Sequence, residues 1–143
     1  MKFVAENETE FVNKTWQAIE SSVRSGFVLG LIGDLGVGKT TLVKSIAKKL
    51  GCRANVTSPT FVYFKEYPVS NSENIKSIKH IDLYRLKSAS KNQTNEIMEW
   101  LEANNSLVIV EWADLLKNEK LFDAIISIKF LSKSKREVNI KWK

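Results

Sequence analysis

The sequence predicts an α/β fold with a mostly parallel central sheet, flanking helices and a C-terminal antiparallel hairpin. Two short apolar runs, 27–32 and 107–110, are typical of strands buried in the middle of a parallel sheet. Apolar residues recur at helical spacing before and after the first run. Segments 125–131 and 137–143 each alternate apolar with polar residues, which is typical of a hairpin. The length of 143 residues suits one domain spanning residues 1–143.

Up to Gly51, the chain is expected to form a helix, a strand and a second helix. The strand, 27–32, leads directly into a glycine-rich loop. The second helix, 39–50, has apolar residues on one face and lysines on the other, and Gly51 follows as its stop. The first helix is expected to end at Gly26, and its apolar face repeats at intervals of four, three and four residues: Val12, Trp16, Ile19 and Val23.

After Gly51, five strands and one helix are expected from the apolar patterns and the polar segments between them. In chain order they are a strand at 61–67, a strand ending near Asp82, a helix at 95–104 after a polar loop at 88–94, a strand at 107–110 ending at Glu111, and the hairpin strands at 125–131 and 137–143.

The composition excludes several kinds of site. With one cysteine, Cys52, and one histidine, His80, the chain can form neither an internal disulfide nor a Cys/His zinc cluster, so any metal is expected to be bound by oxygen. The acidic start does not fit a signal peptide, and no apolar run approaches the roughly 18 residues of a membrane span. A cytoplasmic protein without a membrane partner is therefore expected.

Positive charge gathers near the C-terminal end. The net charge is +6, and residues 129–143 contribute six basic residues against the single acid Glu137. Two interpretations stay open. The stripe attracts a polyanion such as RNA, or the lysines protect an exposed sheet edge from aggregation.

Residues 33–40 match the pattern G-x-x-x-x-G-K-[ST] of a phosphate-binding loop (P-loop), between a predicted strand and a predicted helix. In such a loop, backbone N–H groups and the helix N-terminus face phosphate oxygens. Lys39 is expected at the β- and γ-phosphates, and the Thr40 hydroxyl is a suitable ligand for Mg²⁺. The predicted nucleotide-binding residues are Gly33, Asp34, Leu35, Gly36, Val37, Gly38, Lys39, Thr40 and Thr41.

Two carboxylates follow predicted strands, where P-loop enzymes place residues that bind the metal and orient water. Glu111 follows four apolar residues, the usual form of a Walker B strand. Asp82 has the same position after its strand, although it could instead be a turn residue paired with Arg85. The hydroxyls of Ser58 and Thr60 lie where hydrolases hold a loop that senses the γ-phosphate, but Ser-Pro also marks an ordinary turn.

Four motifs, in order, resemble the bacterial TsaE family: 33–42, 58–61, 80–86 and 110–112. The resemblance implies a P-loop ATPase that uses ATP and Mg²⁺ and is required, with TsaB, TsaC and TsaD, to make N6-threonylcarbamoyladenosine in tRNAs that read ANN codons. It implies that the chain joins the TsaB–TsaD complex, that its hydrolysis supports turnover, and that TsaD transfers the threonylcarbamoyl group.

The same resemblance implies roles for single residues. Thr40 and Glu111 would hold Mg²⁺, and the catalytic set would be Asp82, Glu111 and Lys39. Trp112, next to Glu111, becomes a functional candidate. Two residues outside these motifs are expected to approach the nucleotide, one near the N-terminus and one in the last hairpin: Thr9 and Arg136.

Other functions remain as alternatives. A signalling GTPase is not favoured, because the chain lacks both an N-K-x-D segment and a D-x-x-G loop. A small P-loop kinase would need a lid or an acceptor site, which four arginines and this length do not suggest. The chain could also be a nucleotide-dependent assembly switch with incidental hydrolysis, or a basic RNA-binding protein with an empty loop. Hydrolysis by the chain alone is expected to be slow, because no arginine finger is evident.

Overall fold

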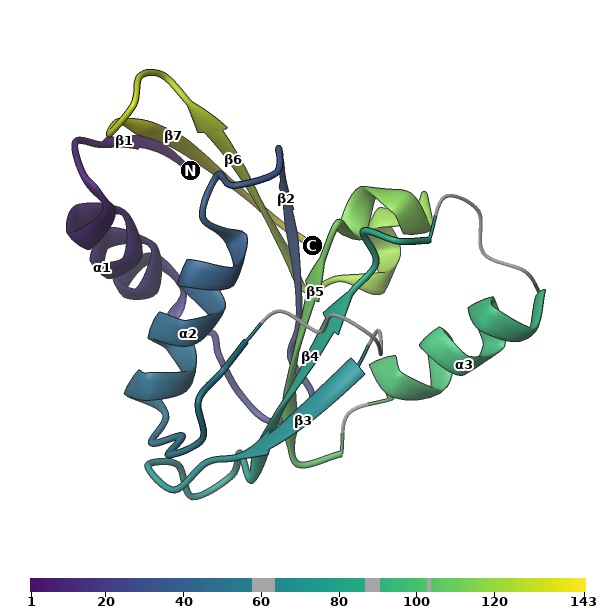
Figure 1. Ribbon diagram of the computed structural model, residues 1–143. Helices are drawn as coiled ribbons and strands as arrows, with labels where there is room; N and C mark the ends of the chain where they lie inside the picture. Colours follow the sequence, from purple (N-terminus) through teal and green to yellow (C-terminus); the bar gives the residue numbers. More distant parts are fainter. Residues whose placement is uncertain (58–63, 87–90, 103) are drawn as a thin grey trace.

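A seven-stranded sheet forms the middle of the molecule, with three α-helices in the part of the chain that the structure describes (Figure 1). The structure is a computed structural model and describes residues 1–57, 64–86, 91–102 and 104–143. The elements are β1 (Lys2–Ala5), α1 (Glu8–Ile19), β2 (Val28–Gly33), α2 (Lys39–Lys49), β3 (Phe64–Pro68), β4 (Ser77–Asp82), α3 (Lys91–Leu101), β5 (Ser106–Glu111), two 3₁₀ turns (Ala113–Leu116 and Glu119–Leu121), β6 (Ala124–Phe130) and β7 (Arg136–Trp142).

The strands lie in the order β1-β7-β6-β2-β5-β4-β3. The four central strands, β6, β2, β5 and β4, run parallel to one another. Antiparallel pairs complete both sides: β3 pairs with β4, while β7 pairs with β6 and β1 pairs with β7. The mixed α/β fold, the parallel centre of the sheet and the C-terminal hairpin confirm these parts of the predicted fold. The antiparallel pairings of β3 with β4 and of β1 with β7 were not predicted.

Both faces of the sheet are covered. Helices α1 and α2 lie on one face, and α3 and the 3₁₀ turns lie on the other (Figure 1). Alternate residues of β2 therefore enter different cores: Leu29 and Leu31 pack beneath α1 and α2, and Val28 packs on the opposite side. Every residue of β5 is buried, as expected for a central parallel strand. No helix in the described ranges is both long and apolar enough to cross a membrane.

The first helix ends earlier than predicted. It begins after the cap residue Asn7, whose side chain accepts the Glu10 N–H, and it stops at Ile19 rather than near Gly26. Residues 20–26 include three serines and a glycine, which favour turns over helix, and the N–H groups of Ser22 and Val23 bond to the Ile19 carbonyl. Val23 still packs against the core. Its apolar side chain therefore indicated burial correctly, although the residue is not part of the helix.

Two other differences have simple causes. Helix α3 begins at Lys91, within the segment 88–94 that was predicted as a loop. The sequence did not indicate this start, because the first residues of the helix are polar and show no apolar periodicity. Strand β1 was not predicted at all: its four residues carry little pattern, and its pairing with β7 depends on a segment more than 130 positions away. Residues 61–63 of the predicted strand 61–67 lie outside the described residues.

Candidate functional site

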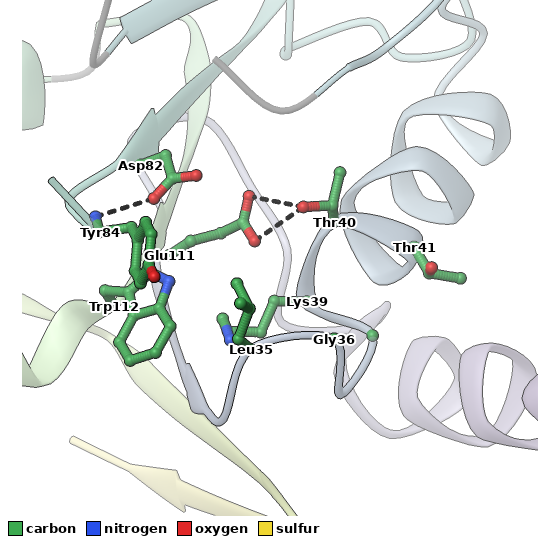
Figure 2. Close-up of a pocket in the computed structure, with 10 residues that line it drawn as sticks. Leu35, Gly36, Lys39, Thr40, Thr41, Asp82, Tyr84, Glu111 and Trp112 are labelled. Atoms are coloured by element: carbon green, nitrogen blue, oxygen red, sulfur yellow. Dashed lines mark hydrogen bonds between the residues drawn. The ribbon is translucent and has the colours of Figure 1, made fainter. Parts of the chain in front are cut away.

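A pocket opens where α2 begins, beside the carboxyl ends of β4 and β5. It is lined by Leu35, Gly36, Gly38, Lys39, Thr40, Thr41, Asp82, Tyr84, Glu111 and Trp112. The parallel register pairs Asp82 with Glu111, so the two carboxylates end neighbouring strands. Figure 2 shows both near Thr40, with the aromatic residues Tyr84 and Trp112 beside them. The sheet thus brings together residues that the sequence places more than 70 positions apart.

The segment 33–40, hereafter the glycine loop, joins β2 to α2. Gly38 caps α2 with a positive φ of 118°, a conformation that L side chains rarely adopt. A Cβ atom at Gly38 would also come within 3.1 Å of the Phe11 ring. The loop therefore needs glycine here both for its backbone angle and for close packing against α1.

Lys39 points into the loop and is almost fully buried. Its Nζ atom donates to the carbonyl oxygens of Gly33 at 2.5 Å and Asp34 at 2.9 Å, and it lies 4.2 Å from the centroid of the Trp112 ring. Burial lowers the pKa of Lys39, and nearby carboxylates, Glu111 first among them, act in the opposite direction. A desolvated ammonium group at this position is well placed to interact with an anion.

Thr40 and Glu111 are joined directly. The Thr40 hydroxyl donates toward both carboxylate oxygens of Glu111, with Oγ1 lying 3.0 Å from Oε1 and 3.1 Å from Oε2 (Figure 2). The Glu111 side chain is buried, and its Oε2 atom is 2.5 Å from the Nε2 atom of His80. Strands β4 and β5 and the first turn of α2 are thereby connected through polar side chains.

Asp82 lines the pocket and also takes part in the turn after β4. Its Oδ1 atom accepts a 2.9 Å hydrogen bond from the Tyr84 backbone N–H, and its side chain faces the pocket (Figure 2). Asp82 therefore takes part in a turn and also lines the pocket, while its predicted role in hydrolysis stays a prediction. The Tyr84 ring lies against Trp112, with ring centroids 5.0 Å apart, and Trp112 has a positive φ of 60°. This unusual backbone conformation turns the chain sharply after Glu111 and leaves the Trp112 ring at the pocket.

Other predicted residues lie elsewhere. Arg136 is buried behind the glycine loop and binds the Val37 carbonyl, and it does not line the pocket. Thr9 is exposed on α1 and is also absent from the pocket lining. Gly33, Asp34 and Val37 belong to the loop without lining the pocket, and Ser58 and Thr60 lie outside the described residues.

Sequence reasoning missed two residues of this site, His80 and Tyr84. The alternation of a strand provides a signal for His80, because residues 80 and 82 of one strand face the same side. For Tyr84, the sequence indicated only that the residue lies in a turn after the strand. Its position beside Trp112 depends on the backbone conformation after Glu111, and no local sequence pattern predicts that conformation.

The oxygen ligands that the pocket offers are of the kind that fits a magnesium ion. No group of three or more His, Cys, Asp or Glu side chains able to hold a metal occurs among the described residues. A hydroxyl, Thr40, and the carboxylates Glu111 and Asp82 offer oxygen ligands in one pocket. Mg²⁺ usually takes few protein ligands and keeps waters and phosphate oxygens for the rest, so this sparse set suits it.

Comparison with known proteins identifies the family. The family model described as "Threonylcarbamoyl adenosine biosynthesis protein TsaE" matches residues 6–139. The chain belongs to the TsaE family. The fold is also similar to that in the crystal structure of Bacillus subtilis YdiB, with a TM-score of 0.71 at 26% identity, covering 99% of this chain and 84% of that one.

Three relatives named "tRNA threonylcarbamoyladenosine biosynthesis protein TsaE" illustrate the relationship within the TsaE family. The Rickettsia felis protein is 34% identical over 78% of this chain, and the Bacillus subtilis protein is 35% identical over 78%. These matches span 63% and 65% of the two relatives, less than two thirds of their length. The Aquifex aeolicus protein is 32% identical over 98% of this chain and 96% of its own length.

Proposed function

We propose that this TsaE-family chain is a P-loop ATPase whose Mg²⁺-dependent hydrolysis supports formation of N6-threonylcarbamoyladenosine in tRNA. The observation that carries the proposal is the bond between Thr40 and Glu111 beside the buried ammonium group of Lys39. These three groups meet at the N-terminus of α2, where the helix dipole and the loop N–H groups favour a phosphate. We infer the link to tRNA modification from the name of the relatives, "tRNA threonylcarbamoyladenosine biosynthesis protein TsaE".

Each residue has a task in holding the triphosphate. Lys39 exchanges the Gly33 and Asp34 carbonyls for phosphate oxygens, because an ammonium group binds an anion more strongly than a neutral carbonyl. Thr40 and Glu111 would hold Mg²⁺ through oxygen. When bound, the ion would supply positive charge that offsets the negative charge of the phosphate oxygens.

Asp82 is the residue best placed to orient the attacking water. Its carboxylate ends the strand next to Glu111 and faces the same pocket. Oriented by this carboxylate, the water attacks the γ-phosphorus, the bond to the bridging oxygen of ADP breaks, and ADP and inorganic phosphate leave. The proton of the water passes to Asp82 or to the phosphate product.

A partner is expected to complete the site. No arginine lines the pocket in the described part of the chain, although an arginine commonly stabilises the transition state in this enzyme class. The exposed residues Leu35 and Tyr84 also leave the pocket rim open to solvent. We therefore assign the stimulating role to the TsaB–TsaD complex, and we expect the chain alone to hydrolyse ATP slowly.

The test is ATP hydrolysis by the purified chain with and without the TsaB–TsaD complex. We expect stimulation by the complex and a loss of at least about tenfold in Glu111→Gln, which keeps the shape of the side chain but removes its charge. Lys44→Ala, at an exposed position of α2, serves as the control and should retain activity.

Equal hydrolysis in the wild type and Glu111→Gln would contradict the site. If Glu111→Gln loses hydrolysis but still supports tRNA modification with the complex, the chain is instead a nucleotide-dependent assembly switch. Full-speed hydrolysis without the complex would contradict the need for a partner.

A further inference from the structure

His80 is a fully buried polar residue that the proposed reaction does not itself require. It lies on β4, two residues before Asp82, and its exposed fraction is 0%. Its Nε2 atom is 2.5 Å from Oε2 of Glu111. Among the described residues, its Nδ1 atom has no hydrogen-bond partner. All of its polar contact is therefore directed at one carboxylate.

The pattern of partners indicates which ring nitrogen carries the proton. The Glu111 carboxylate accepts hydrogen bonds, so Nε2–H is the donor in this pair. The Nδ1 atom is buried without a hydrogen-bond partner in the described part of the chain, so the bond from Nε2 to Glu111 is the polar contact that holds the ring there.

The geometry explains what this bond does to Glu111. The last torsion of a glutamate side chain is broad, so a carboxylate held at one point can rotate. Thr40 lies almost equally far from both oxygens, 3.0 and 3.1 Å, and therefore does not by itself select one of them. His80 contacts Oε2 alone and so sets the rotation of the carboxylate.

We propose that His80 is a positioning residue that fixes the Glu111 carboxylate in the orientation that receives Mg²⁺ beside Thr40. This inference rests on the proposed function, since it concerns the same magnesium ligand. Groups that orient a metal ligand typically change metal affinity by about 10–100-fold when they are removed. His80 does not line the pocket itself, so its effect on the pocket is exerted through Glu111.

A pair of amide substitutions separates this role from simple packing. In His80→Gln, the amide nitrogen can take the place of Nε2 and donate to Glu111. In His80→Asn, the same amide is too short and matches the position of Nδ1 instead. The two variants place the same amide group in this buried position but differ in reach and in volume. A packing difference therefore appears in the melting temperature, whereas a lost bond to Glu111 appears in the magnesium response.

The experiment is a calorimetric titration of ADP into each variant, first in EDTA and then over a series of Mg²⁺ concentrations, with thermal melting to check folding. We expect all three proteins to bind ADP in EDTA within about threefold of one another, because the glycine loop and Lys39 are unchanged. We expect His80→Asn to need about 10–100-fold more Mg²⁺ for its half-maximal effect and His80→Gln to stay within about threefold of the wild type.

Two results would overturn the inference. In the first, His80→Asn keeps the magnesium response of the wild type. In the second, His80→Gln and His80→Asn lose that response equally although both fold. Failure of the wild type to respond to Mg²⁺ would instead contradict the proposed function, so the two failures are distinguishable.

Discussion

Arg136 donates a hydrogen bond from Nε to the Val37 carbonyl oxygen, 2.7 Å away, and thereby ties strand β7 to the glycine loop. The guanidinium group also lies 5.2 Å from the centroid of the Phe11 ring and 5.3 Å from that of Phe130. It is almost fully buried, with an exposed fraction of 8%. The glycine loop is thus held from behind by a cation placed between two aromatic rings.

Replacing this cation should affect both the loop and the stability of the protein. In Arg136→Leu the apolar contacts are largely kept, but the Val37 carbonyl loses its donor. We expect the free energy of unfolding, measured in urea, to fall by about 1–3 kcal/mol, since hydrogen bonds to charged groups contribute in this range. ADP affinity should fall as well because the loop is less well held.

Lys133→Gln is the control, since Lys133 is exposed on the same hairpin. A loss of ADP affinity in Arg136→Leu with unchanged stability would contradict the bracing role. That result would favour the sequence-based prediction that Arg136 reaches the nucleotide.

The glycines of the loop should differ in their tolerance of alanine. Gly36 and Gly38 both have positive φ, so alanine costs backbone strain of about 1–3 kcal/mol at either position. At Gly36 nothing lies within 4 Å of the added Cβ atom, whereas at Gly38 the Phe11 ring lies within 3.1 Å. We therefore expect Gly38→Ala to lose more ADP affinity and more stability than Gly36→Ala. Equal losses in calorimetry and urea unfolding would refute the packing argument.

Nucleotide binding should weaken in alkaline solution before an ordinary lysine titrates. Burial lowers the pKa of Lys39 from its ordinary value of 10.5, and phosphate binding requires the charged form. ADP affinity should therefore fall, by up to tenfold per pH unit, as the pH rises from the lowered pKa toward 10.5.

Stability should change in the opposite direction over the same interval. The pKa of Lys39 is lower in the folded chain than in the unfolded chain, so between the two values the unfolded chain binds more protons. The free energy of unfolding therefore rises with pH over this interval. Calorimetry at several pH values, combined with urea unfolding, separates this effect from alkaline unfolding. Constant ADP affinity up to pH 10.5 would contradict the assigned role of Lys39.

The parts of the fold that the sequence predicted best are those with local patterns. Strands β2 and β5 are buried apolar runs, and α2 has a regular apolar face with Gly51 at its end, so each carries its own signal. Strand β1 and the true end of α1 depend on distant partners and on competing turns, which a local pattern does not contain.

The candidate site divides in the same way. The glycine loop, Glu111 and Asp82 were predicted from spacing, and the sheet brings them into one pocket. The bond between His80 and Glu111 depends on the register of β4 and β5, and the bond between Arg136 and Val37 joins residues 99 positions apart. Contacts of this kind are set by topology and are not visible in any short motif.

The basic residues near the C-terminus lie on β6, on or just after β7, and in the turn between these strands. Strand β1 pairs with residues 136–139 of β7 and forms that edge of the sheet, so the hairpin lies beside the edge. Edge protection and attraction of a polyanion both stay predictions. Lys133 is exposed, while Lys135 pairs with Glu6 at 3.3 Å and Lys141 pairs with Glu119.

Glutamine at Lys133, Lys135 and Lys141 should weaken association with tRNA or with the TsaB–TsaD complex at low salt. The effect should shrink as salt rises, because it is electrostatic. Filter binding over a salt series measures it, and glutamine at the three exposed lysines of α2, Lys44, Lys48 and Lys49, is the matched control. Equal losses for the two sets would show that only net charge matters.

The most direct measurement is a calorimetric titration of folded protein with ATP or ADP in the presence of Mg²⁺. We expect one binding site in the wild type and in the surface variant Lys44→Ala, and loss of binding in Lys39→Ala, because the ammonium group that faces the loop carbonyls is then absent. Absence of binding by the folded wild type, or unchanged binding by Lys39→Ala, would contradict it.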